Sequence, residues 1–382
     1  MSGNIRKAAA LLAMVISSIG GSTYAEDSGA NLSAATALQE MSPGWNLGNT
    51  LEAIGSGKAP FTVSQETAWG NPVVTQALMN TVKAAGFKSV RIPVAWSEYA
   101  DGGNTIDPAW MARVTEVVTY ARNAGLYVVI NVHWDGGWMQ PTYADQTAVN
   151  VKLTTFWTQI ANNFKGFDDH LLFAGTNEVM VTNVYSAPTR ENCAVQNSFN
   201  QTFVNAVRTT GGNNAGRFLV VQGYNTNIDY TVACNATLPA DSAAGKLMME
   251  VHYYDPYNFT LNANSGIWQW GSIATKASAA ETWANEAYTD GQFQKMKASF
   301  IDKGVPVILG EYSAMRRTEY DATGKYRNHW DEYITRSAHK HGIVPMYWDN
   351  GPTSNHSSGL FDRAAAKQAF PDTITAIVDA GS

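Results

Sequence analysis

Two glutamates stand at positions where reactive groups are commonly held. Glu178 follows the apolar run Leu171–Gly175, and Glu311 follows the apolar run Val305–Leu309. A carboxylate directly after a buried strand is held at the mouth of the sheet, half out of water. Hydrolysis of a glycosidic bond needs such a pair, because one group protonates the leaving oxygen while the other attacks or activates water. We therefore expect a carboxylate pair with glycosidase chemistry.

Further polar or aromatic side chains end other apolar runs: Asn46, Arg91, His133, Asn177, His252, Tyr254 and Trp348. A metal site, with His133 and His252 as ligands beside the glutamates, is the competing interpretation. Arg91 favours the hydrolase, since a fixed cation is a poor neighbour for a metal ion but a good donor to a carboxylate. Serine-hydrolase chemistry is disfavoured because the sequence has no G-x-S-x-G motif.

Eight strand-and-helix units are expected to position these residues. Continuous apolar, β-branched runs are typical of parallel strands buried on both faces. We expect strands at Gly44–Leu47, Ser89–Ile92, Tyr127–Asn131, Leu171–Gly175, Phe218–Gln222, Leu247–Tyr253, Val305–Leu309 and Val344–Trp348. Helices are expected at Pro72–Ala85, Ala109–Ala124, Val151–Phe164, Ser198–Thr209, Phe293–Lys303, His329–His341 and Asp372–Asp379, after a polar lead that ends near Ser42.

This order of elements predicts an α/β fold of the (β/α)8 barrel type in a single domain. In a barrel, the carboxyl ends of all eight strands meet at one face, where active sites are built. An open dinucleotide-binding sheet is disfavoured, because the turn after the first strand (Gly44–Thr50) does not match G-x-G-x-x-G. No Pro- or Ser-rich linker divides the 382 residues.

Composition excludes some partners. The chain carries 26 basic and 32 acidic side chains, a net charge of −6, without a basic cluster beyond the first residues. Nucleic acid is therefore not expected as a partner, because phosphate contacts need clustered Lys and Arg. The 12 Trp, 17 Tyr and 14 Phe include rings that suit stacking on sugars, although core packing accounts for most of them.

The first 25 residues resemble a secretion signal. Arg6 and Lys7 precede an apolar stretch from Ala8 to Gly21, and small residues surround a cleavage point after Ala25. We expect residues 1–25 to be removed, residues 26–382 to form the catalytic domain, and the protein to be secreted or periplasmic, with no membrane association after cleavage. In an oxidising compartment Cys193 and Cys234, in segments expected to be loops, either form a disulfide or stay free.

Several motifs together resemble glycoside hydrolase family 5. They are Gly44–Thr50, Arg91-Ile92-Pro93, Asn177-Glu178, His252-Tyr253-Tyr254 and Gly310-Glu311-Tyr312, and the resemblance runs from about Gly44 to Phe361. The subgroup it looks most like contains endo-β-1,4-glucanases, on the strength of Tyr253–Tyr257 and Met346–Asn350. The resemblance implies a (β/α)8 barrel, retention of anomeric configuration, and neither cofactor nor metal.

The resemblance also implies a role for each site residue. Glu178 would be the acid/base and Glu311 the nucleophile, with Arg91 and Tyr254 orienting Glu311. The remaining residues would contact the reacting sugar: Asn46, His133, Asn177, His252 and Trp348. Trp134 departs from many relatives, which have a second His there, and this puts one sugar contact in doubt. Four further tryptophans in expected loops are either sugar platforms or ordinary packing residues: Trp69, Trp138, Trp268 and Trp270.

The expected partner is a polysaccharide, cut in mid-chain by a monomeric enzyme. We expect xyloglucan to be the best substrate, since no insertion is long enough to roof the cleft and loop tryptophans can stack on its branches. A β-mannanase of the same clan, or a plain cellulase or lichenase, is the alternative within hydrolases. A catalytically silent sugar-binding module is the alternative outside them, and the intact glutamate pair argues against it.

Overall fold

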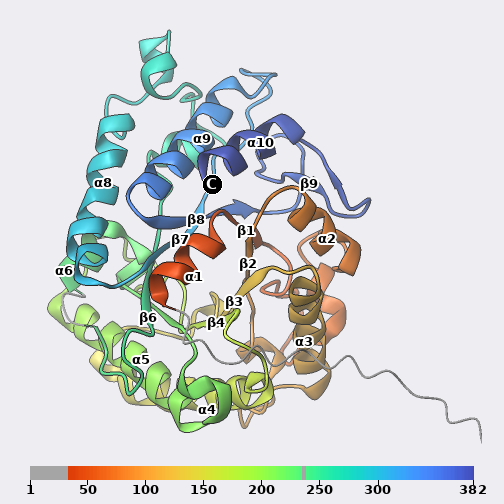
Figure 1. The fold of residues 1–382 in the computed structure, drawn as a ribbon, viewed down its shortest axis with the longest axis vertical. Coiled ribbons are helices and arrows are strands. Elements are labelled where there is room, and N and C mark those ends of the chain that lie inside the picture. Colours follow the sequence, from red (N-terminus) through yellow and green to blue (C-terminus); the bar gives the residue numbers. More distant parts are fainter. Residues whose placement is uncertain (1–32, 235–237) are drawn as a thin grey trace, which may run out of the picture. The chain divides into compact units, whose positions relative to one another are not determined.

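The strands close into one parallel barrel (Figure 1). The computed structural model describes residues 33–234 and 238–382; the expected signal peptide lies outside these residues. The strands follow chain order around the barrel, and the last pairs with the first: β1 Gly44–Leu47, β2 Ser89–Ile92, β3 Tyr127–Asn131, β4 Leu171–Ala174, β5 Leu219–Gln222, β6 Leu247–His252, β7 Val307–Tyr312 and β8 Ile343–Asp349. All eight expected strands are present, so the predicted (β/α)8 barrel is confirmed. Residues 33–382 form one compact unit.

Helices cover the outside of the barrel (Figure 1); α1 precedes the first strand, and the others come after strands. They are α1 Ala34–Met41, α2 Gln76–Ala84, α3 Pro108–Asn123, α4 Tyr143–Phe164, α5 Arg190–Thr209, α6 Ile228–Cys234, α7 Tyr257–Thr260, α8 Glu286–Ser299, α9 Lys325–Lys340 and α10 Pro371–Ala380. A small hairpin, β9 Phe361–Asp362 and β10 Lys367–Gln368, precedes α10. Within the described residues, no helix is long and apolar enough to cross a membrane.

Capping residues explain where the helix predictions differ from the structure. α4 and α5 begin eight residues before the predicted starts, because Thr142 and Thr189 accept hydrogen bonds from the backbone N–H groups of their first turns. α2 begins later than predicted, at the cap Thr75. The polar lead before Ser42, for which no helix was predicted, contains α1, which Ser33 caps.

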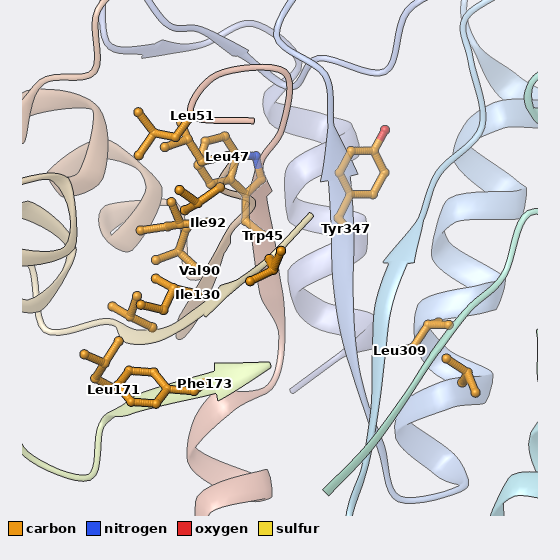
Figure 2. Packing of buried hydrophobic residues seen from close by; sticks show 14 of the residues in the cluster. Trp45, Leu47, Leu51, Val90, Ile92, Ile130, Leu171, Phe173, Leu309 and Tyr347 are labelled. Atoms are coloured by element: carbon orange, nitrogen blue, oxygen red, sulfur yellow. The ribbon is translucent and has the colours of Figure 1, made fainter. Parts of the chain in front are cut away.

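The core lies between the barrel and its helices. Trp45, Leu47, Val90 and Ile92 face outward into it, as does Ile130 on β3, and all are fully buried (Figure 2). Because side chains alternate along a strand, the residues between them point into the barrel. The barrel interior therefore receives a second set of side chains, several of them polar.

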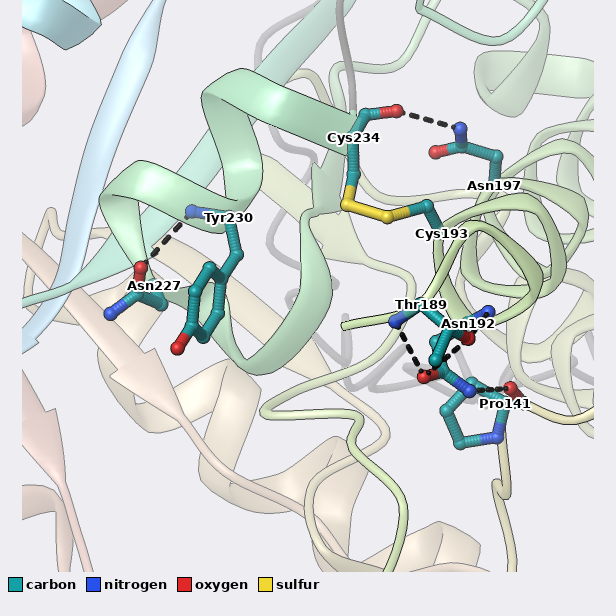
Figure 3. Close-up of a disulfide and its surroundings, with 8 residues drawn as sticks. All are labelled: Pro141, Thr189, Asn192, Cys193, Asn197, Asn227, Tyr230 and Cys234. Carbon is teal, nitrogen blue, oxygen red and sulfur yellow. Dashed lines mark hydrogen bonds between the residues drawn. A yellow bond between two sulfur atoms is a disulfide. The ribbon is translucent and has the colours of Figure 1, made fainter. Parts of the chain in front are cut away.

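A disulfide joins Cys193 and Cys234, whose Cα atoms are 5.1 Å apart (Figure 3). The expectation that both cysteines lie in loops is wrong: Cys193 is the fourth residue of α5, and Cys234 is the last residue of α6. Asn197 of α5 also donates to the carbonyl of Cys234 at 2.9 Å. The disulfide thus fixes the short α6 against the long α5.

Candidate active site

Glu311 is held by donors on both of its oxygens. Near the end of β7, its Oε1 accepts from Arg91 Nη1 at 2.9 Å, and its Oε2 accepts from the Tyr254 hydroxyl at 2.9 Å. The carboxylate is buried, with 7% of the side chain exposed. Two fixed donors leave this carboxylate little rotational freedom.

Arg91 is the centre of the polar network inside the barrel. Its side chain is fully buried, and it comes from β2. Nη1 also donates to Asn46 Oδ1 at 3.0 Å, and Nη2 donates to Asn177 Oδ1 at 2.7 Å. Asn46 in turn donates to the carbonyls of Gly310 and Met346. Residues that lie far apart in the sequence are therefore brought together at one mouth, as predicted.

His252 connects the two glutamates. Its Nδ1 lies 2.7 Å from Glu178 Oε1 and 3.7 Å from Glu311 Oε2. One oxygen each of Glu178 and Glu311, together with this nitrogen, lie within 4.8 Å of one another. Glu178 is the accessible member, with 41% of its side chain exposed. The structure thus forms the expected pair from one buried and one accessible carboxylate.

Glu250 is a site residue that the sequence analysis missed. It lies in the middle of β6, with 1% of its side chain exposed, and its Oε1 is 2.8 Å from Arg91 Nε and 3.2 Å from His252 Nε2. Its Oε2 accepts from Gln222 Nε2 at 2.6 Å. A side chain at Gly310 would collide with this carboxylate, because a Cβ there would lie 2.0 Å from Oε1. The sequence offered one signal for this residue, since Glu250 is the single acidic residue in the predicted strand Leu247–Tyr253.

These contacts shift the acid–base properties of the site. Burial raises the pKa of Glu311 above its usual value, an effect that the nearby His252 and Arg91 only partly oppose. Burial alone would lower the pKa of His252, but the surrounding carboxylates, Glu311 first, raise it to about 9. Burial alone would raise the pKa of Glu250, yet Arg91 and His252 lower it to about 2. The site therefore holds two cations, Arg91 and protonated His252, among three carboxyl groups.

The same electrostatics oppose the metal interpretation. Glu178, His252 and Glu311 have the spacing of a potential ligand set. A protonated imidazole cannot offer its Nδ1 to a metal ion, however, since that nitrogen carries a proton. Both oxygens of Glu311 already accept hydrogen bonds from Arg91 and Tyr254.

His133 and Trp348 form an aromatic wall of the site. Their rings lie parallel, with centroids 5.9 Å apart and an interplanar angle of 4°. Asn131 orients His133 through a contact of 3.1 Å to Nδ1. Burial first, and then the positive charge of Arg91, keep the pKa of His133 well below its usual value. His133 is therefore a neutral imidazole at pH 7.

The four candidate tryptophan platforms differ in exposure. Trp69 is 40% exposed, whereas Trp138 and Trp268 are half-buried. Of the two alternatives left open for Trp270, packing is the one observed: it is 2% exposed, donates to the Ala284 carbonyl, and packs against α9. Trp134, at the position that departs from many relatives, is 58% exposed.

Comparison with known proteins decides the family. Residues 54–354 match the model of the family described as cellulase (glycosyl hydrolase family 5). The chain belongs to glycoside hydrolase family 5. Endoglucanase A of Paenibacillus barcinonensis is 39% identical, over 90% of this chain and 88% of the relative. The xyloglucan-specific endo-β-1,4-glucanase BoGH5A of Bacteroides ovatus is 42% identical, over 88% of this chain and 68% of the relative.

Solved structures agree with this assignment. A family 5 xyloglucanase from Paenibacillus pabuli, determined in complex with ligand, superposes with a TM-score of 0.86 at 41% identity, over 90% of this chain and 99% of that chain. A broad-specificity endoglucanase from Bacteroides salanitronis gives a TM-score of 0.85 at 38% identity, over 92% and 96%. This family 5 chain is thus a glycoside hydrolase with endo-β-glucanase relatives.

Proposed function

We propose that this chain is a secreted or periplasmic, retaining endo-β-1,4-glucanase with xyloglucan as its preferred substrate. The observation that carries the mechanism is the separation of the carboxylates, one oxygen each of Glu178 and Glu311 lying within 4.8 Å of one another. Retaining glycosidases have carboxyl groups about 5–5.5 Å apart, whereas inverting enzymes need about 6.5–9.5 Å to admit a water molecule.

The first step follows from the roles of the two carboxylates. Glu311, oriented by Arg91 and Tyr254, attacks the anomeric carbon and forms an ester bond with the sugar. The bond from that carbon to the glycosidic oxygen breaks, and Glu178 gives its proton to the departing oxygen. Asn177, whose Oδ1 is held by Arg91, donates from Nδ2 to the 2-hydroxyl of the sugar.

The second step releases the sugar. Glu178, now a carboxylate, takes a proton from water as that water attacks the anomeric carbon, and the ester bond to Glu311 breaks. Two inversions at one carbon give net retention. His252 stays protonated between the two side chains and offers its positive charge to whichever glutamate is ionised, which is Glu311 before the first step and Glu178 after it.

Support for xyloglucan comes from relatives and from exposed rings. Several of the similar proteins carry xyloglucan or xyloglucanase in their names, while others are named endoglucanases. Trp69 and Trp134 expose aromatic surface that branches can contact. Binding energy from such remote groups can raise turnover, because it helps to orient the reacting sugar.

Initial rates on equal masses of xyloglucan, barley mixed-linkage glucan, carboxymethylcellulose and β-mannan test the substrate. We expect xyloglucan to be cut fastest; if it is cut slowest among the glucans, a plain cellulase or lichenase is the better assignment, and mannan as the best substrate would indicate a mannanase. Proton NMR of the first product should show the β-anomer, and early α-anomer would refute retention. N-terminal sequencing of the exported protein should begin at Glu26.

A further inference from the structure

Glu250 lies in β6, close to His252 in the sequence, and the steps of the proposed reaction leave its charge unused. Its Oε1 is 2.8 Å from Arg91 Nε and 3.2 Å from His252 Nε2, and its Oε2 accepts from Gln222 Nε2 at 2.6 Å. Buried ion pairs can often be replaced by apolar residues without loss of stability. A carboxylate at this depth, with 1% of its side chain exposed, therefore points to a role beyond folding.

Only a carboxylate satisfies all the partners of Glu250. Arg91 Nε can only donate a hydrogen bond. Gln222 Nε2 is held as a donor, because Gln222 Oε1 accepts from both the N–H and the hydroxyl of Thr176 at 3.0 Å. Both oxygens of Glu250 must therefore accept. A glutamine at this position offers one acceptor and one donor, so in either orientation its amide nitrogen would face another donor.

His252 transmits the effect of this carboxylate to the acid/base glutamate. Its Nε2 faces Glu250 Oε1, and its Nδ1 lies 2.7 Å from Glu178 Oε1, so both ring nitrogens meet carboxyl oxygens. Only the doubly protonated imidazolium can donate to both. Burial alone would lower the pKa of this ring, but Glu311, Glu178 and Glu250 raise it to about 9.

Other charged and titratable groups face the His252 ring from the remaining strands. Arg91 of β2 is a cation and disfavours a protonated ring, whereas His133, which follows β3, is neutral. Glu311 Oε2 lies 3.7 Å from Nδ1 and also accepts from the Tyr254 hydroxyl. Among the described residues, Glu250 is the carboxylate that meets Nε2.

This arrangement directs the proton of Glu178. An acid that protonates the leaving oxygen must carry its proton on the carboxyl oxygen that faces the substrate. Because His252 Nδ1–H donates to Glu178 Oε1, the proton of a neutral Glu178 is left to Oε2. A ring without the Nδ1 proton would instead accept the carboxyl proton from Oε1, and the departing oxygen would receive none.

We propose that Glu250 is a positioning residue, which keeps both ring nitrogens of His252 protonated so that the transferable proton of Glu178 lies on the oxygen facing the leaving group. The inference rests on the proposed function, because it takes Glu178 as the acid. Glu250 touches neither the sugar nor the reacting atoms and acts through His252. Gln222 fixes the carboxylate through its hydrogen bond to Oε2.

Nitrogen NMR of the histidine rings gives the first readout. In the unmodified protein both nitrogens of His252 should stay protonated up to about pH 9, and His252→Asn assigns the signal by its absence. In Glu250→Gln the ring should lose its proton about 1–3 pH units lower, the usual effect of one adjacent opposite charge. A ring that titrates below pH 7 in the unmodified protein overturns the inference without any change at Glu250.

The pH profile of kcat/KM gives the second readout, since the position of a limb does not depend on the amount of folded enzyme. On cellohexaose, whose leaving group needs protonation, the basic limb of Glu250→Gln should move about one pH unit lower. On β-cellobiosyl fluoride, whose leaving group needs none, it should not move. The matched control is Glu66→Gln, in a buried pair with Arg113 of α3, and it should leave the limb in place.

A double variant, Glu250→Gln with Gln222→Glu, separates charge from packing. It keeps the hydrogen bonds, because the new amide donates to the new carboxylate, whose other oxygen still accepts from Thr176. The negative charge, however, moves one strand away from His252. We expect the double variant to be more stable than Glu250→Gln and its basic limb to stay below that of the unmodified enzyme.

Three results overturn the inference: an unmoved limb in Glu250→Gln, equal shifts on both substrates, or full return of the limb in the double variant. If Glu250→Gln does not fold, the double variant and the titration of His252 in the unmodified protein decide the matter. Full activity of Glu178→Ala on cellohexaose would instead refute the proposed function, because the NMR titration of His252 does not depend on the role of Glu178.

Discussion

Replacing Glu250 by glutamine tests whether the buried charge network stabilises the fold. Glutamine keeps the shape of the side chain beside Gly310 but removes the charge that faces Arg91 and His252. The pKa of Glu250 is lowered from 4.5 to about 2, and a difference of that size corresponds to about 3 kcal/mol of stability at neutral pH. Removal of one partner of a buried ion pair costs about 3–5 kcal/mol of stability in other proteins, which is similar to the value obtained from the pKa.

The pH dependence of this effect has a definite sign. Because the pKa is lower in the folded state, the stabilisation is complete above the unfolded-state pKa of about 4.5 and is lost as pH falls toward 2. Chemical denaturation followed by circular dichroism should therefore show Glu250→Gln about 3 kcal/mol less stable than the unmodified protein at pH 7. The difference should shrink between pH 4.5 and 3.

The half-exposed Glu332, which pairs with Arg336 along α9, provides the control. Glu332→Gln should change the free energy of unfolding by less than about 1 kcal/mol, since such surface pairs contribute little. A Glu250→Gln difference that is equally large at pH 3 and pH 7 would refute the electrostatic argument, because steric effects do not titrate. A difference no larger than that of Glu332→Gln would refute it as well.

Three further predictions concern catalysis and the disulfide. Glu178→Ala should lose far more activity on polymer than on aryl glycosides with good leaving groups, because only a poor leaving group needs protonation; equal losses on both would remove Glu178 from the acid role. Activity should fall as the pH drops through the raised pKa of Glu311, because protonation removes the nucleophile. Tyr254→Phe should move this acid limb of the kcat/KM profile to higher pH, since it removes a hydrogen-bond donor to the charged carboxylate. An acid limb that does not move in Tyr254→Phe would contradict that reasoning. The disulfide joins residues 41 positions apart, and its reduction should lower the free energy of unfolding by about 2–4 kcal/mol in denaturant titrations. The unfolding of a Cys193→Ser/Cys234→Ser double variant should be insensitive to reductant.

The positions of the apolar runs in the sequence were sufficient to predict the barrel. Eight continuous apolar runs located all eight strands, because strands buried on both faces leave a strong pattern in the sequence. Polar residues after those runs then indicated which side chains would lie together, since a barrel brings every strand end to one face. Helix starts were harder, because the polar first turns of α4 and α5 give no apolar signal.

Features that depend on tertiary packing could not be predicted from the sequence. Glu250 contacts Arg91 across the barrel interior, a contact that no spacing along β6 reveals. Trp270 has the same residue type as the exposed Trp69, yet neighbours from α9 bury it. Tertiary packing decides both cases.

The disulfide has a consequence for producing this enzyme. Cys234 ends α6, the same short helix that places Asp229 at a cavity beside Glu178. A preparation from a reducing cytosol would lack the link between α6 and α5. Batches from different hosts would then differ in redox state, and with it in how firmly the cavity wall is held. Kinetic constants from such batches are comparable only after the thiol content has been titrated.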